Sequence, residues 1–222
     1  MTGAPAFSIR SLIHSYDGKT ALDIPRLDIP PGQVCALTGP NGSGKTTLLS
    51  ILAFLLMPAS GSVLLNGIEA VGSRDHRLRR KVTLVHQKPV LFSTTVWNNI
   101  AYGLKAVGLP SSEIKSRVQA IVRETGLSDV AERQARRLSG GEAQRVVLAR
   151  AMVLQTPVIL LDEPTNSLDD SFKPILSELL LKANRRRGIT IVMATHDLNF
   201  VSSLGSRIVQ MEQGRIIDSS NA

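Results

Sequence analysis

Short runs of apolar residues alternate along the chain with longer segments in which apolar residues recur at helical spacing. Apolar runs lie at residues 34–37, 82–86, 158–161 and 189–194, and the run at 158–161 is continuous, as expected for a strand that is covered on both faces. Helical segments are predicted between these runs. The pattern therefore predicts an α/β domain built on a mostly parallel sheet.

The N-terminal part has a different pattern. Residues 7–16 and 21–29 favour two strands, and Asp17-Gly18 between them is a turn signal. Because the two strands are so close in sequence, they predict an antiparallel N-terminal β layer. A further strand is predicted at residues 62–65, followed by a hairpin turn at Asn66-Gly67.

Helical spacing dominates from residue 87 to residue 138. Residues that can cap helices precede two segments of this stretch: Thr94 or Thr95, and Ser111 or Ser112. The stretch predicts an α-helical subdomain, about residues 88–140, inserted into a single domain that covers residues 1–222. The remaining predictions are helices at about 141–152 and 171–187 and closing strands at 207–211 and 215–217.

Composition excludes several classes of protein. The 222 residues are 43% hydrophobic and 20% charged, as in ordinary globular chains. The N-terminus lacks the pattern of a secretory signal, and the longest apolar run, residues 51–57, is too short to span a membrane. The single cysteine, Cys35, excludes an internal disulfide, and its apolar strand favours buried packing. We expect a cytoplasmic protein.

The net charge of +8 is compatible with nucleic acid, with anionic lipid, or simply with a solvated surface. The basic clusters are short and carry no interleaved aromatic residues. Because stacking on bases needs such aromatics, no nucleic-acid partner is expected.

One motif carries specific chemistry. The nine residues that follow the strand at 34–37 are Gly39-Pro40-Asn41-Gly42-Ser43-Gly44-Lys45-Thr46-Thr47. A Leu/Ile-rich segment follows, so both the spacing and the flanks match a phosphate-binding loop, in which backbone N–H groups face phosphate oxygens. Lys45 can reach the β- and γ-phosphates, and the Thr46 hydroxyl can bind Mg²⁺. The alternative is a glycine-rich turn with an incidental lysine, which the flanking strand and helix disfavour. We expect the chain to bind a nucleoside triphosphate.

Two of the predicted strands end in polar residues. Asp162-Glu163 follows one apolar run, and His196 lies just after another. In parallel α/β sheets, ligands bind at the carboxyl ends of the strands, where the glycine loop also lies. Asp162 is therefore expected to face the Mg²⁺ that Thr46 binds, and Glu163 to accept a proton from the water that attacks the γ-phosphate. Acidic residues also cap turns, but a phosphate-binding loop in the same chain favours the metal and base roles.

Taken together, the motifs resemble the nucleotide-binding domain of the ATP-binding cassette (ABC) transporter family. The resemblance covers nearly the whole chain, and the Leu-Ser-Gly-Gly signature separates this family from other P-loop ATPases. It implies hydrolysis of ATP with Mg²⁺ on a P-loop NTPase core with an N-terminal antiparallel layer and an inserted helical subdomain. The motifs are, in chain order, Gly39 to Thr46, Gln87, Leu138 to Arg145, Val158 to Pro164, Ser167-Leu168-Asp169 and His196.

The resemblance also implies roles for single residues. Tyr16 corresponds to an aromatic that stacks on adenine, with packing on the core as its alternative. Gln87 corresponds to a glutamine that contacts Mg²⁺ and the attacking water. His196 corresponds to a histidine that contacts the γ-phosphate and holds this water together with Glu163. A single histidine is more often structural, but its place after a strand favours this role.

A second copy of the chain is implied as a partner. Ser139, Gly140 and Gly141 would contact the γ-phosphate bound by that second copy, because the family forms head-to-tail dimers that enclose two ATP molecules. Asp169 would lie at the same interface.

A short chain of this kind resembles the separate ATPase subunit of a bacterial importer. The implied partners are a membrane permease and an extracytoplasmic solute-binding protein, with this subunit at the inner face of the cell membrane. Apolar residues follow Gln87 where the family docks its permease: Val90, Leu91, Phe92 and Trp97. Packing within the helical subdomain is the alternative for each of them. Residues 89–105 are similar to the corresponding stretch of tungstate-type oxyanion importers.

Two other functions were considered. A soluble ABC protein that acts in DNA repair or on ribosomes usually has two cassettes in tandem or a long coiled-coil insertion, and the sequence has neither. A basic nucleic-acid-binding module would leave the nucleotide motifs unexplained.

Overall fold

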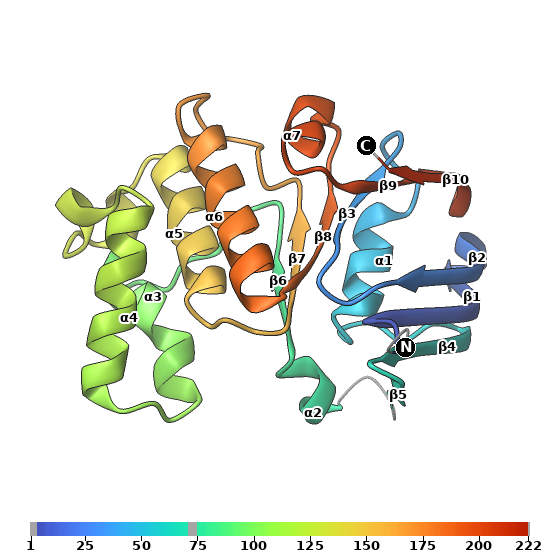
Figure 1. The fold of residues 1–222 in the computed structure, drawn as a ribbon, viewed down its shortest axis with the longest axis horizontal. Helices are drawn as coiled ribbons and strands as arrows, with labels where there is room; N and C mark the ends of the chain where they lie inside the picture. The colour runs from blue at the N-terminus through green and yellow to red at the C-terminus, as the bar shows by residue number, and fades with distance from the viewer. Residues whose placement is uncertain (1–3, 71–74, 222) are drawn as a thin grey trace.

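The computed structural model describes residues 4–70 and 75–221, so the first three residues considered for a secretory signal lie outside the described part. Two sheets form its framework (Figure 1). One has four strands in the order β2-β1-β4-β5, and the other has six in the order β10-β9-β3-β8-β7-β6. The bounds of these strands are β1 Phe7–Tyr16, β2 Lys19–Ile29, β3 Val34–Thr38, β4 Ser60–Leu65, β5 Ile68–Glu69, β6 Val82–Val85, β7 Val158–Asp162, β8 Thr190–Ala194, β9 Arg207–Glu212 and β10 Arg215–Asn221.

The four-stranded sheet is the predicted antiparallel layer. β1 pairs antiparallel with both β2 and β4, and β4 with β5. The predicted hairpin turn is also confirmed, since Asn66 and Gly67 both have positive φ between paired strands. A β-bulge interrupts the pairing of β1 with β2 between His14 and Ser15. His14 pairs with Leu22 and Ser15 with Thr20, so the extra residue of this bulge is Ala21 on β2.

The six-stranded sheet is mostly parallel, as the apolar runs predict. β3 lies between β8 and β9, and β8 continues to β7 and β6, with parallel pairing throughout. Every residue of β3, β7 and β8 is buried. Only β10 pairs antiparallel. The carboxyl ends of β3, β7 and β8 therefore meet at one edge of the sheet.

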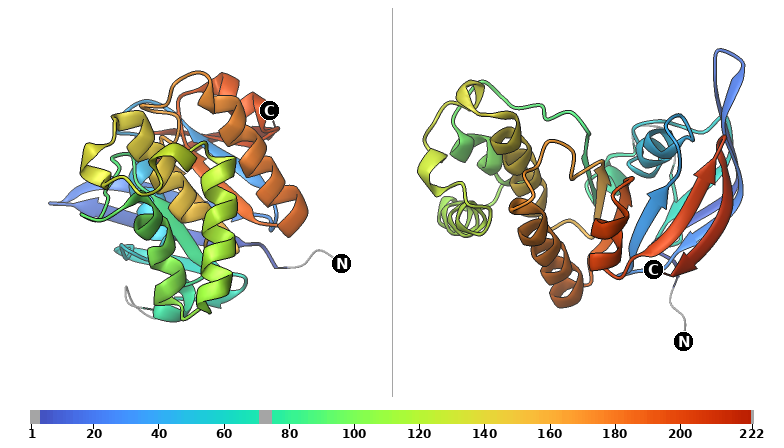
Figure 2. Two further views of the ribbon diagram at one scale, coloured as in Figure 1. Left: turned by 90° about the vertical axis from the view of Figure 1, so that its left-hand side faces the viewer. Right: turned by 90° about the horizontal axis from the view of Figure 1, so that it is seen from above.

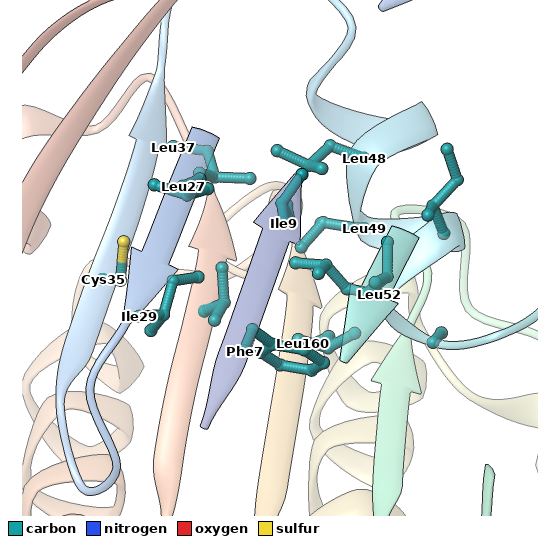
Figure 3. Packing of buried hydrophobic residues seen from close by; sticks show 14 of the residues in the cluster. Phe7, Ile9, Leu27, Ile29, Cys35, Leu37, Leu48, Leu49, Leu52 and Leu160 are labelled. Carbon is teal, nitrogen blue, oxygen red and sulfur yellow. The ribbon is translucent and has the colours of Figure 1, made fainter. Parts of the chain in front are cut away.

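Helices cover the large sheet on both faces. Their bounds are α1 Lys45–Leu52, α2 His76–Arg79, α3 Val96–Ala106, α4 Ser111–Glu124, α5 Gly140–Met152, α6 Phe172–Arg187 and α7 Leu198–Ser203. On one face, α1 lies between the two sheets, and its leucines pack against strands of both (Figure 3). Cys35 is buried in this cluster, where burial raises the pKa of its thiol to about 12, in agreement with the predicted packing role. On the other face, α5, α6 and α7 cover β3, β7 and β8.

The helical part lies at the far end from the antiparallel sheet (Figure 2). There α3, α4 and α5 share a third apolar cluster, so α5 packs on the large sheet with one side and on α3 and α4 with another. The limits of an inserted subdomain at about 88–140 remain a prediction. No described helix is long and apolar enough to cross a membrane.

Some helix ends differ from those predicted. Thr95 caps α3 as expected, since its Oγ1 accepts a hydrogen bond from the Asn98 N–H at 3.1 Å. The cap predicted at Ser111 or Ser112 is wrong. Pro110 holds the N-cap position with extended backbone (φ −59°, ψ 145°), so Ser111 already belongs to the helix and its side chain does not cap it. Two short helices, α2 and α7, were not predicted, because neither spans enough residues to show a helical period.

Candidate functional site

The glycine loop connects β3 to α1 in a form that only glycine permits at two positions. Gly39 has φ 139°, and a Cβ there would lie 2.0 Å from the Met211 carbonyl oxygen. Gly44 has φ 100°, and a Cβ there would lie 2.6 Å from the Leu22 Cδ2. The sequence folds locally this way because glycine has no Cβ to clash in such places. As a result, α1 begins directly at the loop with no side-chain cap on its first N–H groups.

Lys45 and Thr46 occupy the first turn of α1. The Lys45 Nζ donates hydrogen bonds to the Gly39 carbonyl at 2.8 Å and the Pro40 carbonyl at 2.9 Å, so it lies across the inside of the loop. The Thr46 Oγ1 lies 3.0 Å from the Asp162 Oδ2. Two oxygen ligands of the kind that Mg²⁺ prefers are thus next to the lysine that would face phosphates.

Asp162 and Glu163 come at the end of β7. Burial raises the pKa of Asp162, while the hydrogen bond from Thr46 lowers it and the neighbouring Glu163 carboxylate raises it further. A cation bound between Thr46 and Asp162 would offset this penalty on the charged form. The next residue, Glu163, has φ 48°, an uncommon conformation for a non-glycine residue and one found at functional sites. This backbone places the Glu163 carboxylate beside His196, whose Nδ1 lies 2.9 Å from the Glu163 Oε2.

A hollow of about 320 Å³ lies beside these residues, and His196 does not line it. Its lining comprises Tyr16, Ala21, Asn41, Gly42, Gly44, Lys45, Thr46, Thr47, Gln87, Asp162 and Glu163. The structure therefore brings together the predicted residues from β1, the glycine loop, β7 and the segment after β6. Ala21 also lines the hollow, and it was not predicted because an alanine side chain carries no group that binds a ligand. In the described ranges, no group of three or more His, Cys, Asp or Glu side chains is arranged to hold a metal ion.

The predicted signature residues do not line this hollow. Ser139 is the N-cap of α5, where its Oγ accepts from the Glu142 N–H at 3.2 Å and the Glu142 Oε2 accepts from the Ser139 N–H at 2.8 Å. The hydrogen bond from the Ser139 backbone lowers the pKa of Glu142. Gly140 and Gly141 lie in the first turn, and a Cβ at Gly140 would meet no atom within 4 Å.

Asp169 lies next to α5, the helix that begins at the Leu-Ser-Gly-Gly signature. Its carboxylate forms an ion pair with Arg145 of α5, and a Cβ at Gly141 would lie 3.3 Å from the Ser167 carbonyl oxygen. Arg145 also places its guanidinium 4.5 Å from the centre of the Phe172 ring. Sequence reasoning gave Arg145 no role, since nothing in its spacing points to a partner 24 residues away.

The sequence matches a known protein family whose members share this architecture and the glycine loop. Residues 22–166 match the family model described as ABC transporter. The chain belongs to the ABC transporter family. It is accordingly an ATP-binding ATPase, as the motifs predict.

Several ABC proteins resemble the chain over most of its length. The tungstate uptake system ATP-binding protein TupC of Peptoclostridium acidaminophilum is 37% identical over 209 residues, which cover 94% of this chain and 95% of TupC. The methionine import ATP-binding protein MetN of Corynebacterium glutamicum is 38% identical, and the match spans 90% of this chain but 56% of MetN.

Solved ABC structures share the fold. The dimeric ATP-binding cassette MJ0796 bound to ADP and Pi superposes with a TM-score of 0.90 at 29% identity, covering 97% of this chain and 98% of that one. CbiO1 of Clostridium perfringens, part of the ABC transporter complex CbiONQ, gives a TM-score of 0.85 at 32% identity, covering 98% of this chain and 89% of its own. The predicted ABC ATPase fold is confirmed.

Proposed function

We propose that this ABC ATPase powers solute import by a separate membrane permease, and that the hollow beside the glycine loop is its ATP site. One observation carries the assignment of the site. The Thr46–Asp162 pair and the Glu163–His196 pair lie at the same sheet edge, next to Lys45. A metal position, a base and a phosphate-binding cation are thus present in one place.

In this site the loop N–H groups and Lys45 would hold the phosphates, and Thr46, Asp162 and Gln87 would supply oxygen ligands to Mg²⁺. Mg²⁺, when bound, neutralises charge that develops on the phosphate oxygens. The Glu163 carboxylate accepts the proton of a water whose oxygen forms the new bond to the γ-phosphorus, as the bond from that phosphorus to ADP breaks. His196, 2.9 Å from this carboxylate, orients the same water.

We assign the second half of the site to another copy of the chain. Ser139, Gly140 and Gly141 form the start of α5 and do not line the chain's own hollow. In a head-to-tail dimer this end would meet the partner's γ-phosphate, and the adjacent Asp169 would lie at the interface. Closure of such a dimer on ATP and its opening after hydrolysis would drive the permease.

We place the permease contact in a groove of about 350 Å³ beside β6. Val90, Phe92 and Tyr102 line this groove, and their side chains are 69%, 43% and 55% exposed. Exposed apolar patches of this kind mark sites of protein–protein contact. Arg150 of α5 forms part of the groove wall and donates a hydrogen bond to the Val90 carbonyl at 2.9 Å. Leu91 and Trp97 pack instead against the apolar cluster that α3, α4 and α5 share. The groove thus lies between β6, α3 and α5.

Import is proposed because relatives that match most of this chain are named for uptake or import. An oxyanion such as tungstate is the proposed solute, on the length and strength of the match to TupC. With a permease and a solute-binding protein as partners, this subunit would lie on the inner face of the cell membrane. A soluble ABC ATPase acting in DNA repair or on ribosomes is not favoured by these relatives.

The test is a pull-down from solubilised membranes with tagged Glu163→Gln protein and ATP. We expect an integral-membrane permease to co-purify. A Val90→Asp, Phe92→Asp variant is the matched control, because charges in the groove should abolish this recovery and leave ATP binding intact. Recovery of ribosomes or DNA-repair proteins in place of a membrane protein would contradict the transporter assignment.

A further inference from the structure

Tyr16 is presented to the ATP site in an unusual way. It is the last residue of β1, lines the nucleotide hollow and is 50% exposed. The pairing of β1 with β2 shifts register between His14 and Ser15, just before Tyr16, and the extra residue is Ala21 of β2, which lines the same hollow. An aromatic ring on such an exposed strand end loses rotamer freedom when a ligand binds, unless another group already holds it.

His14 holds this ring. Only 7% of its surface is exposed, and its ring centre lies 4.8 Å from that of Tyr16 with the planes at 81°. That T-shaped arrangement is one that aromatic pairs favour, because the positive edge of one ring meets the negative face of the other. Opposite His14 on β2 is Leu22, which lies against Gly44 of the glycine loop. The stacking residue and the phosphate loop are therefore joined through His14 and Leu22.

Packing alone does not explain a histidine at this position. Neither its Nδ1 nor its Nε2 has a hydrogen-bond partner among the described residues. The fully buried Leu12 and Leu22 show that apolar side chains are accommodated on this side of the hairpin. An apolar residue would fill the space without burying two unpaired polar atoms, which is unfavourable. The contact that distinguishes His14 from an aliphatic residue is its ring contact with Tyr16.

We propose that His14 is a positioning residue for base recognition. It fixes the Tyr16 ring in the orientation that stacks on adenine, and so increases the affinity for ATP without acting on the phosphates. The inference rests on the proposed function of Tyr16. An edge-to-face ring contact of this type corresponds to a factor of about two to ten in a binding constant.

The test compares two ligands, ATP and inorganic tripolyphosphate, each with Mg²⁺, by titration calorimetry. His14→Leu removes the ring at similar volume, and His14→Phe restores a ring without the nitrogens. We expect His14→Leu to weaken ATP binding about two- to tenfold, His14→Phe to recover most of this loss, and tripolyphosphate to bind all three proteins equally. Unchanged ATP affinity in His14→Leu, equal weakening toward both ligands, or no recovery in His14→Phe would overturn the proposal.

Tyr16→Ala separates this inference from the function on which it rests. If Tyr16→Ala weakens ATP binding and His14→Leu does not, the inference alone fails. If Tyr16→Ala has no effect, base stacking by Tyr16 fails and the inference fails with it. In the Tyr16→Ala background, His14→Leu should cause no further loss, and an additional loss there would overturn the positioning role. His14→Gln serves as a second ringless variant if the leucine variant does not fold.

Discussion

The helices α1 and α5 both start at glycines that are proposed to face ATP, but their N-termini are built differently. Gly44 precedes α1 in a left-handed conformation, and neither a side-chain cap nor an acidic residue occupies the first turn. Ser139 and Glu142 form a capping box at the start of α5. The first helix end thus leaves its N–H groups for a ligand, whereas the second is already satisfied in part by its own chain.

This difference has a consequence for binding. The N-terminus of α1, with Lys45 beside it, attracts phosphates by its own charge. The N-terminus of α5 carries the Glu142 carboxylate, whose pKa is lowered by the Ser139 backbone, so it is negative at neutral pH and weakens the attraction for a free anion. The signature end is therefore suited to a phosphate whose charge is already neutralised by another copy's lysine and Mg²⁺. On the proposed function, the N-terminus of α1 would capture ATP, and the N-terminus of α5 of another copy would recognise the ATP once it is bound.

Glu163→Gln should have the largest effect. It removes the proposed base and keeps the shape of the side chain, in the half of the ATP site next to α1, which we call the capturing half; the half at the N-terminus of α5 is the recognising half. ATP hydrolysis should slow by about 10²- to 10⁴-fold, the range typical of a general base. ATP affinity should be retained, and the bound nucleotide should hold a dimer visible by size-exclusion chromatography. The exposed Glu178→Gln on α6 is the control and should behave as the unmodified protein. Normal turnover by Glu163→Gln would exclude its role as the base.

Gly140→Asp should disrupt only the recognising half, that is, the proposed contact of the α5 N-terminus with the partner's γ-phosphate. A Cβ at Gly140 meets no atom within 4 Å, and an acidic residue suits the first turn of a helix, so the chain itself should fold normally. The new carboxylate would repel the partner's γ-phosphate, and like charges at an interface cost several kcal/mol, so ATP-dependent dimerisation should weaken about a hundredfold or more.

Analytical ultracentrifugation of this variant with ATP, alongside calorimetry of ATP binding, measures both halves at once. Gly140→Ala is the matched control and should still dimerise. A Gly140→Asp protein that dimerises and hydrolyses ATP normally would show that the signature does not contact nucleotide.

Lys45→Met should weaken ATP binding by the capturing half. The Nζ now bonded to the Gly39 and Pro40 carbonyls is the cation expected to turn to the phosphates. Since charge-assisted hydrogen bonds contribute about 1.5–3 kcal/mol, the dissociation constant for ATP should rise about 10- to 100-fold. The thermal stabilisation by ATP should shrink accordingly. Unchanged affinity by calorimetry would refute the phosphate role.

Local patterns predicted the capturing half well. A buried strand, a glycine loop and a helix follow one another in the chain, so the sequence order itself brings Gly39, Lys45 and Thr46 together. Asp162 and Glu163 could be placed beside them because parallel strands end at a common edge.

Contacts that depend on side-chain direction were not predicted. The Arg145–Asp169 ion pair joins two elements through a loop whose path no periodicity reveals. His14 could have been found by its spacing of two from Tyr16, which places both residues on one side of a strand, but spacing does not show that the two rings are in contact. The missing cap at Ser111 has a similar origin, since the dihedral angles of Pro110 decide where α4 begins.

Asp28→Asn should give the smallest effect and separate loss of stability from loss of function. Asp28 lies on β2, where the hydrogen bond from Arg10, together with those from Ser8 and Arg26, holds the pKa of its carboxyl down at about 2. The folded pKa is below the unfolded one, so the charged carboxylate stabilises the fold above about pH 4, and this contribution is lost as the pH falls toward 2. Because the Arg10 and Arg26 side chains are 42% and 73% exposed, screening should reduce the contribution to about 1 kcal/mol.

Urea unfolding at several pH values measures this contribution. The free energy of unfolding of Asp28→Asn should fall about 1 kcal/mol below that of the unmodified chain at pH 7, and the difference should shrink between pH 4 and pH 2. Asp28 lines neither the ATP hollow nor the permease groove, so ATP affinity and ATP-dependent dimerisation should not change. If this variant also lost dimerisation, a general loss of stability would explain the Gly140→Asp result equally well. If it does not, the effects at α1 and α5 belong to the two halves of the ATP site.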